Sequence, residues 1–109
     1  MSVTSSNSGT QTATIDTEHT LDTITSAGIY VLVVDMANLT TGDIVTLKAK
    51  VKYASGGTSR LAYQATYAHD QAEPIKFSPP VPIDTEVVFT LEQTDGTGRS
   101  FPWNILKVA

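Results

Sequence analysis

Apolar and polar residues alternate with a period of two along most of this chain, which is the pattern of half-buried β-strands. The clearest example is DIVTLKAKVKY, residues 43–53, where three lysines share the phase opposite the apolar side chains. A helix would scatter these lysines around its circumference. The side chains predicted to face inward from this strand are Val45, Leu47, Ala49, Val51 and Tyr53.

Similar alternation recurs in short stretches that are separated by Gly, Pro, Asn and Asp residues typical of turns. No stretch has a convincing period of 3.6, so no helix is predicted. Pro102 predicts an edge strand or a bulge, and SPPVP (78–82) predicts a stiff crossover or a sheet edge. With 43–53, the predicted strands are 12–15, 18–24, 28–36, 60–70, 73–77, 85–93 and 100–108. About eight short strands predict an all-β fold, either an antiparallel β-sandwich or a jelly roll.

One predicted strand, GIYVLVVDM (28–36), is apolar on both faces. Ile29, Val31 and Val33 occupy the phase that a half-buried strand would give to polar residues. This pattern predicts a central strand that is covered on both sides, or a strand whose second face meets a partner.

The length of 109 residues fits one domain, preceded by an N-terminal segment of different composition. Residues 1–11 are rich in Ser, Thr, Asn and Gly, with Met1 and Val3 as the apolar residues. They are predicted to form a flexible arm that is disordered alone or orders on a neighbouring subunit, where Val3 would be an anchor. Residues 12–109 are predicted to form the β-sandwich domain.

Charge and cysteine content narrow the class of protein. The net charge of −4 disfavours a nucleic-acid-binding role, which would require a basic surface. The sequence has no cysteine, so it forms no disulfide and no thiolate metal site. It has no apolar run long enough for a transmembrane helix, and its start lacks the basic and apolar regions of a secretory signal. We therefore expect a protein made in the cytoplasm without export and without a membrane partner.

The stretch TDGTGRSFPWNI (94–105) has the small residues of a phosphate-binding loop. A P-loop needs a lysine at fixed spacing and a helix after it, whereas here a strand pattern follows. Gly96 and Gly98 are therefore predicted to supply the positive φ angles of a hairpin between the last two strands. Arg99 is predicted to pair with Glu92 or Asp95, or else to reach a partner subunit.

Candidate catalytic groups are few. His19 and His69 lie beside Glu18 and Asp70, but the sequence has no metal-binding spacing such as H-E-x-x-H and no G-x-S-x-G nucleophile motif. Both histidines are predicted to be surface residues at strand ends. The sequence thus predicts neither an enzyme nor a cofactor, a metal site or a small-molecule substrate.

Lys48, Lys50 and Lys52 form the best-defined polar feature. Three like charges on one strand face need acids or solvent to screen them, and Glu86, Glu92 or an acid on another subunit would serve. The row predicts either a solvated face that prevents edge-to-edge aggregation or a docking face for an acidic partner.

The aromatic residues mostly occupy inward phases and are predicted to form the core. Trp103 and Phe77 are the two that could be exposed, although core or a subunit interface is the preferred interpretation. Several outward-facing aromatics would instead indicate a carbohydrate-binding module for host recognition.

The pieces TTGD, YQATYAH, KFSPPVP and TGRSFPW resemble a group of small proteins from tailed bacteriophages and prophages, many encoded among virion structural genes. The resemblance spans roughly residues 20–108. Its motifs are packing and turn sequences, so it carries over no functional residue.

The resemblance implies a structural protein of the virion, with capsid decoration or cement protein as the first expectation. Such a protein would bind across neighbouring major capsid proteins, stabilise the head and associate with itself as a homotrimer. A component of the neck, the tail or the base of a head fibre is the alternative. The partner-binding residues expected on these grounds are Val3, Lys48, Lys50, Lys52, Arg99 and Trp103.

Overall fold

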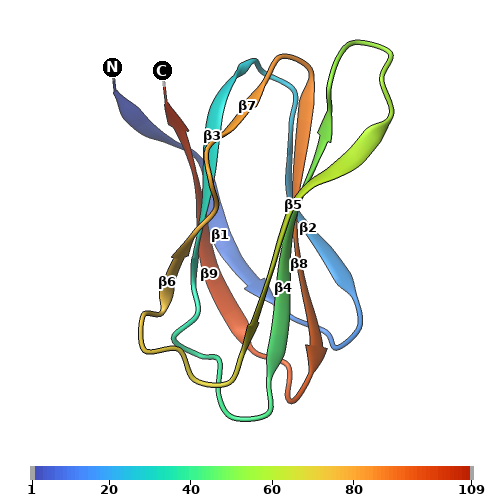
Figure 1. The fold of residues 1–109 in the computed structure, drawn as a ribbon. Helices are drawn as coiled ribbons and strands as arrows, with labels where there is room; N and C mark the ends of the chain where they lie inside the picture. The colour runs from blue at the N-terminus through green and yellow to red at the C-terminus, as the bar shows by residue number, and fades with distance from the viewer. Residues whose placement is uncertain (1, 109) are drawn as a thin grey trace.

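β-Branched and aromatic residues in alternation fold this chain into two antiparallel sheets that pack face to face, as a computed structural model of residues 2–108 shows (Figure 1). Sheet A has the order β1-β9-β3-β6, and β7 also pairs with β3; sheet B has the order β2-β8-β4-β5. Sheet A contains β1 (Val3–Thr12), β3 (Gly28–Asp35), β6 (Ile75–Phe77), β7 (Val81–Ile83) and β9 (Ser100–Val108). Sheet B contains β2 (Glu18–Ile24), β4 (Ile44–Lys52), β5 (Ser59–Ala68) and β8 (Glu86–Asp95). The predicted all-β sandwich is confirmed.

The core lies between the two sheets and follows the predicted alternation. Fully buried side chains from sheet A meet fully buried side chains from sheet B. The largest from sheet A are Tyr30, Leu32, Phe101 and Ile105, and those from sheet B include Leu47, Phe89 and Leu91. Within the described residues, every buried side-chain nitrogen and oxygen atom has a hydrogen-bond partner. The structure contains, over the same residues, no helix that could span a membrane.

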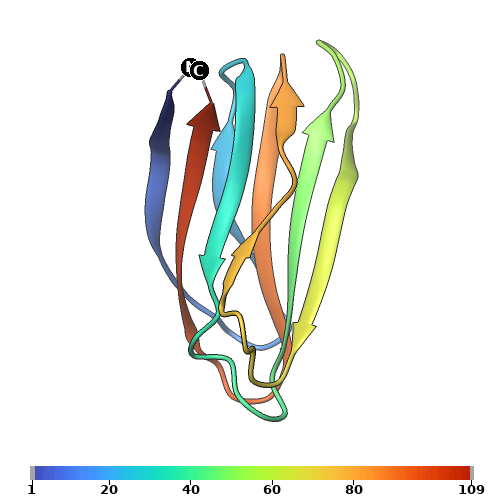
Figure 2. The same cartoon turned by 60° about the vertical axis from the view of Figure 1, so that its left-hand side comes forward.

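The N-terminal segment differs from the predicted flexible arm. Val3–Thr12 forms strand β1, which pairs with β9 of the same chain from Val3 opposite Val108 to Thr12 opposite Ser100. Figure 2 shows β1 beside β9 at one edge of sheet A. This polar strand is held by backbone hydrogen bonds to β9, which do not depend on apolar side chains. Its composition therefore gave no sign of a strand. Met1 lies outside the described residues.

The far edge of sheet A is built from two short strands. β6 pairs with Val33–Asp35 and β7 pairs with Gly28–Tyr30, so both border β3. Between them, the buried Ser78 donates its backbone N–H to Leu32 O, and its hydroxyl accepts from Leu32 N. The proline-rich segment is therefore part of a sheet edge, which was one of the two predictions made for it.

Strand order corrects two further predictions. β8 belongs to sheet B and β9 to sheet A, so their connection crosses between sheets and is not a hairpin. β9 lies between β1 and β3, so Pro102 does not mark an edge strand. Pro102 is tolerated because the pairing with β3 ends at Trp103, which leaves Pro102 opposite only Thr10 of β1.

Sheet B contains two exposed apolar residues at positions where the alternation would place them inward. Tyr53 follows the end of β4 and is 74% exposed, with its ring against Gly57 in the β4–β5 turn. A bulge in the pairing also places Leu61 opposite Lys50, and Leu61 is 53% exposed. Both departures occur where β4 and β5 extend beyond the cover of the other sheet.

Candidate functional site

The second apolar face of β3 becomes the outer surface of sheet A. Tyr30, Leu32 and Val34 enter the core, so Ile29, Val31 and Val33 point away from it. Their partners across the ladder share that face. The strand residues of the outer face are Val3, Ser5, Ser8 and Thr10 on β1, Pro102, Asn104, Leu106 and Val108 on β9, Ile29, Val31, Val33 and Asp35 on β3, Ile75 and Phe77 on β6, and Pro82 on β7.

Apolar side chains run across this outer face in rows. Val3, Val108, Ile29 and Pro82 lie opposite one another on β1, β9, β3 and β7. Nearer the other end, Phe77 lies opposite Val33, and Ile75 lies opposite Asp35. Figure 2 brings this side of the sandwich forward.

Exposure shows that the chain itself does not cover these rows. Val3 is 57% exposed, Ile29 39%, Ile75 48% and Phe77 62%. Asp35 is the one ionisable residue among the strand positions of the face, in a sequence with 18 charged residues. The apolar part of the face lies on β3, β6, β7 and β9, while β1 adds Ser5, Ser8 and Thr10. Exposed apolar side chains with little charge are a feature that surfaces buried by other proteins share.

A shallow depression of about 190 Å³ indents the outer face between β6, β3 and β9. Its floor and walls are apolar, apart from Asp35 and Asn104. The carboxylate of Asp35 accepts a hydrogen bond from Ala37 N at 2.9 Å, so it is engaged by its own loop. The residues that line the depression are Val33, Asp35, Ile75, Pro102, Trp103 and Asn104.

Trp103 joins the core to this surface. It is partly buried, packs against the core and lines the depression. Its indole ring lies under Gly9 of β1, where a Cβ would be 3.2 Å from Trp103 Cζ2. Gly9 therefore lets β1 close over the indole. The expectation of a core or interface position for Trp103 agrees with this placement.

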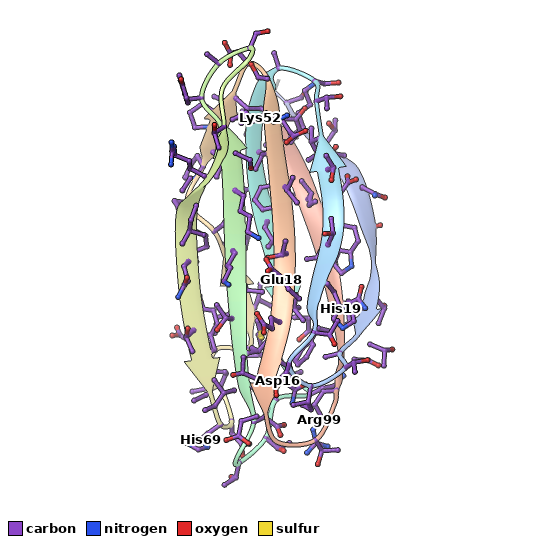
Figure 3. All side chains as sticks on the ribbon, turned by 90° about the vertical axis from the view of Figure 1, so that its right-hand side faces the viewer. Asp16, Glu18, His19, Lys52, His69 and Arg99 are labelled. Carbon is purple, nitrogen blue, oxygen red and sulfur yellow. The ribbon has the colours of Figure 1, made fainter. Side chains whose placement is uncertain are left out.

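The lysine row on sheet B is paired within the chain. Lys50 Nζ lies 2.8 Å from a carboxylate oxygen of Glu18, while Lys48–Glu92 and Lys52–Glu86 are each 3.9 Å apart. Figure 3 shows this face, with Lys52 near one end and Glu18 near the middle. Glu86 and Glu92 were predicted as partners, whereas Glu18 was missed because it comes from β2, whose position beside β8 the sequence does not reveal.

Hydrogen bonds from Lys50 and Thr90 hold the pKa of Glu18 below its ordinary value. Even so, partly exposed pairs of this kind each contribute at most about 1 kcal/mol to the free energy of unfolding. The paired row forms a hydrated outer face for sheet B, in contrast to the apolar outer face of sheet A.

Arg99 belongs to a polar cluster at the end of the sandwich. Its Nε donates to Asp43 Oδ2 at 2.8 Å, and its Nη2 donates to Thr40 Oγ1 at 2.8 Å. Glu92 and Asp95, the predicted partners, are not the residues it pairs with. Asp43 also accepts hydrogen bonds from Thr40 N and Thr97 N. Its residue is only 1% exposed.

The two histidines lie apart and are engaged in local hydrogen bonds (Figure 3). His19 Nε2 accepts from Thr14 N at 3.0 Å, and His69 Nδ1 accepts from Gly42 N at 2.9 Å. Within residues 2–108, no group of three or more His, Cys, Asp or Glu side chains is placed to hold a metal ion.

The two most exposed aromatics do not form a joint platform. Tyr53 follows β4 of sheet B, whereas Phe77 is on β6 at the outer face of sheet A. Phe77 was expected in the core or an interface, and its 62% exposure places it outside the core.

Comparison of the chain with protein-family models, curated proteins and solved structures finds no match.

Proposed function

We propose that this chain is a structural protein of a tailed-phage virion, made in the host cytoplasm, that decorates or cements the capsid. The observation that carries the proposal is the apolar outer face of sheet A, whose character is that of a surface buried by another protein. The resemblance of the TTGD, KFSPPVP and TGRSFPW pieces to phage and prophage proteins supports the virion as the setting.

The difference between the two outer faces supports a mechanical role. Sheet A presents apolar rows, and sheet B presents paired lysines and glutamates that hydrate well. A sandwich with these faces adheres through one side and remains soluble on the other. Repetition of such a contact over a shell would sum into high avidity.

The expected partner-binding residues divide accordingly. Val3 and Trp103 belong to the outer face or its depression, so they remain in the proposed contact surface. Lys48, Lys50 and Lys52 are engaged with acids of the same chain, and Arg99 is engaged with Asp43. These four residues are therefore assigned to internal stability in this proposal.

Quantitative mass spectrometry of purified particles from the phage or prophage that encodes this chain tests the function. Hundreds of copies per particle support capsid decoration. A dozen or fewer copies would place the protein in the neck, the tail or a head-fibre base instead. Absence from purified particles would overturn the virion assignment altogether.

A further inference from the structure

Phe77 is a large apolar side chain that projects from the outer face of sheet A. It is 62% exposed and lies on β6 opposite Val33, which itself lines the depression. An exposed aromatic ring therefore stands directly beside a hollow of apolar character. A knob and a hole on one surface are the two halves of a self-complementary contact.

We propose that the outer face of sheet A binds the same face of a second copy of this chain, with Phe77 of each copy seated in the depression of the other. This inference rests on the proposed function, which uses the same face for the capsid contact, so we assign the dimer to the free protein, whose second copy gives way to the capsid on the particle. A cavity of about 150 Å³ holds a benzene molecule, and the depression measures about 190 Å³. A phenyl ring therefore fits the space available.

The symmetry of such a contact follows from the positions of the two features. A two-fold axis that lies in the plane of the interface, midway between Phe77 and the depression, exchanges them between copies. Both contacts form at once and the assembly closes at two subunits. The dimer thus replaces the trimer that the resemblance led us to expect.

The low charge of this face suits contact with a second copy of the chain. Partners of different sequence are commonly selected by complementary charges, whereas this face offers Asp35 as its one ionisable strand residue. Contacts between identical subunits are on average more apolar than contacts between different proteins. Two copies that meet here also keep their lysine–glutamate faces exposed to water.

The extent of the face limits the contact to a weak dimer. A sheet about four strands wide and eight residues long has a footprint of roughly 500 Å² per copy. Even complete overlap of two copies would bury only roughly 1,000 Å² in total, which is below the range of stable interfaces and typical of weak ones. Phe77 and the depression lie toward the β6 edge of the face, so the contact is centred there.

Analytical ultracentrifugation of the full chain, from micromolar to near-millimolar concentration, tests the dimer. We expect a species of twice the 11.6 kDa chain mass. Phe77→Asp should weaken dimerisation at least about 30-fold, as expected when an aromatic anchor is lost from its pocket. Leu61→Asp, at a 53% exposed position of β5 in sheet B, is the matched control and should remain dimeric. A monomer throughout, a trimer, or equal effects of the two variants would overturn the proposal.

Cysteine pairing is a second test of the geometry. The natural sequence has no cysteine, so each disulfide that forms joins introduced cysteines. Phe77→Cys and Asn104→Cys proteins are mixed and oxidised by air. A 77–104 disulfide between copies is expected to exceed the 77–77 disulfide, and the reverse preference would contradict the knob-in-hole arrangement. The failures are distinguishable: a monomer that is abundant on particles would refute the dimer alone, and a dimer absent from particles would refute the virion function alone.

Discussion

Arg99 and Asp43 are 56 residues apart in sequence, yet Arg99 Nε lies 2.8 Å from Asp43 Oδ2. The pair joins the β8–β9 connection to the loop that precedes β4. Gln93, which is fully buried, reinforces it by accepting a hydrogen bond from Arg99 N and donating to Asp95 O and Thr97 O. We call Asp43, Arg99, Gln93, Thr40 and Thr97 the loop clasp. It holds together the end of the sandwich where the chain crosses between the sheets.

Removing the negative charge of Asp43 should destabilise the fold. Asp43→Asn leaves Arg99 without its anion and removes an acceptor from a site that is 1% exposed. We expect the free energy of unfolding to fall by about 2–4 kcal/mol in urea denaturation. Asp95→Asn is the control, because the carboxylate of the exposed Asp95 accepts from the neighbouring Gly96 N and asparagine retains an acceptor there. Equal losses in the two variants would refute the clasp.

The same comparison made across pH has a definite sign. Burial raises the pKa of Asp43, but hydrogen bonds from Thr40, Arg99 and Thr97 outweigh burial and hold it below the ordinary value of 3.8. A depressed folded-state pKa contributes stability above the unfolded-state value, which is lost as pH falls through the folded-state pKa. The difference in the free energy of unfolding between wild type and Asp43→Asn should therefore be largest at neutral pH and shrink below pH 3.8. Urea titrations of the two proteins at neutral pH and below pH 3.8 measure this difference. A difference that grows in acid would contradict the assignment.

Two glycines with similar backbone angles should respond differently to alanine. Gly42 has φ +92° and nothing within 4 Å of an added Cβ, so Gly42→Ala should cost only the backbone strain of about 1–2 kcal/mol. Gly96 has φ +88°, and its Cβ would collide with the side chain and Cα of Asp43. Gly96→Ala should cost roughly 3–5 kcal/mol because strain and overpacking add. Thermal or urea unfolding that gives the two variants equal stability would show that the clasp does not need this close approach.

Tyr63 provides a test at alkaline pH. Burial, together with a hydrogen bond to Tyr67 and the charge on Tyr67, raises the pKa of Tyr63 to about 12 from 10.0. Its neutral form is favoured in the folded state, so this contribution to stability is present below pH 10 and lost between pH 10 and about 12. In an ultraviolet titration, Tyr63→Phe should remove absorbance change near pH 12. An unaltered absorbance change near pH 12 would contradict the partial burial of Tyr63 on β5.

The sequence pattern predicted most of the longer strands because burial on one face imposes a period of two. The predicted strand 12–15 was wrong, since β1 ends at Thr12 and a turn follows it. Val45, Leu47 and Ala49 are buried as predicted, and the doubly apolar stretch of β3 correctly indicated a second apolar face. Of the two predictions for that face, coverage within the chain was wrong, since Ile29 remains 39% exposed.

What the pattern could not predict depends on contacts between distant segments. The partners of Lys50 and Arg99 are Glu18 and Asp43, and both follow from strand order and from crossings between the sheets. Strand β1 escaped prediction because backbone hydrogen bonds to β9, rather than apolar side chains, hold its Ser- and Asn-rich sequence in place.

Gly98 illustrates the same limit at a single residue. It was predicted to adopt a positive φ angle in a hairpin, but the glycines with positive φ among the described residues are Gly42, Gly56 and Gly96. Gly98 is instead required for close approach, because an added Cβ would lie 2.5 Å from Ala13 O. Only the crossing from sheet B to sheet A brings that carbonyl near.

We propose that another protein subunit covers the outer face of sheet A in the assembled particle. A cryo-EM reconstruction of particles purified from the encoding phage or prophage tests it most directly. We expect density for this sandwich with Val33, Phe77 and Leu106 buried against protein, while the lysine–glutamate face of sheet B remains in solvent. A reconstruction in which the sandwich is present, but its sheet A face is bare and the sheet B face makes the contacts, would contradict the claim.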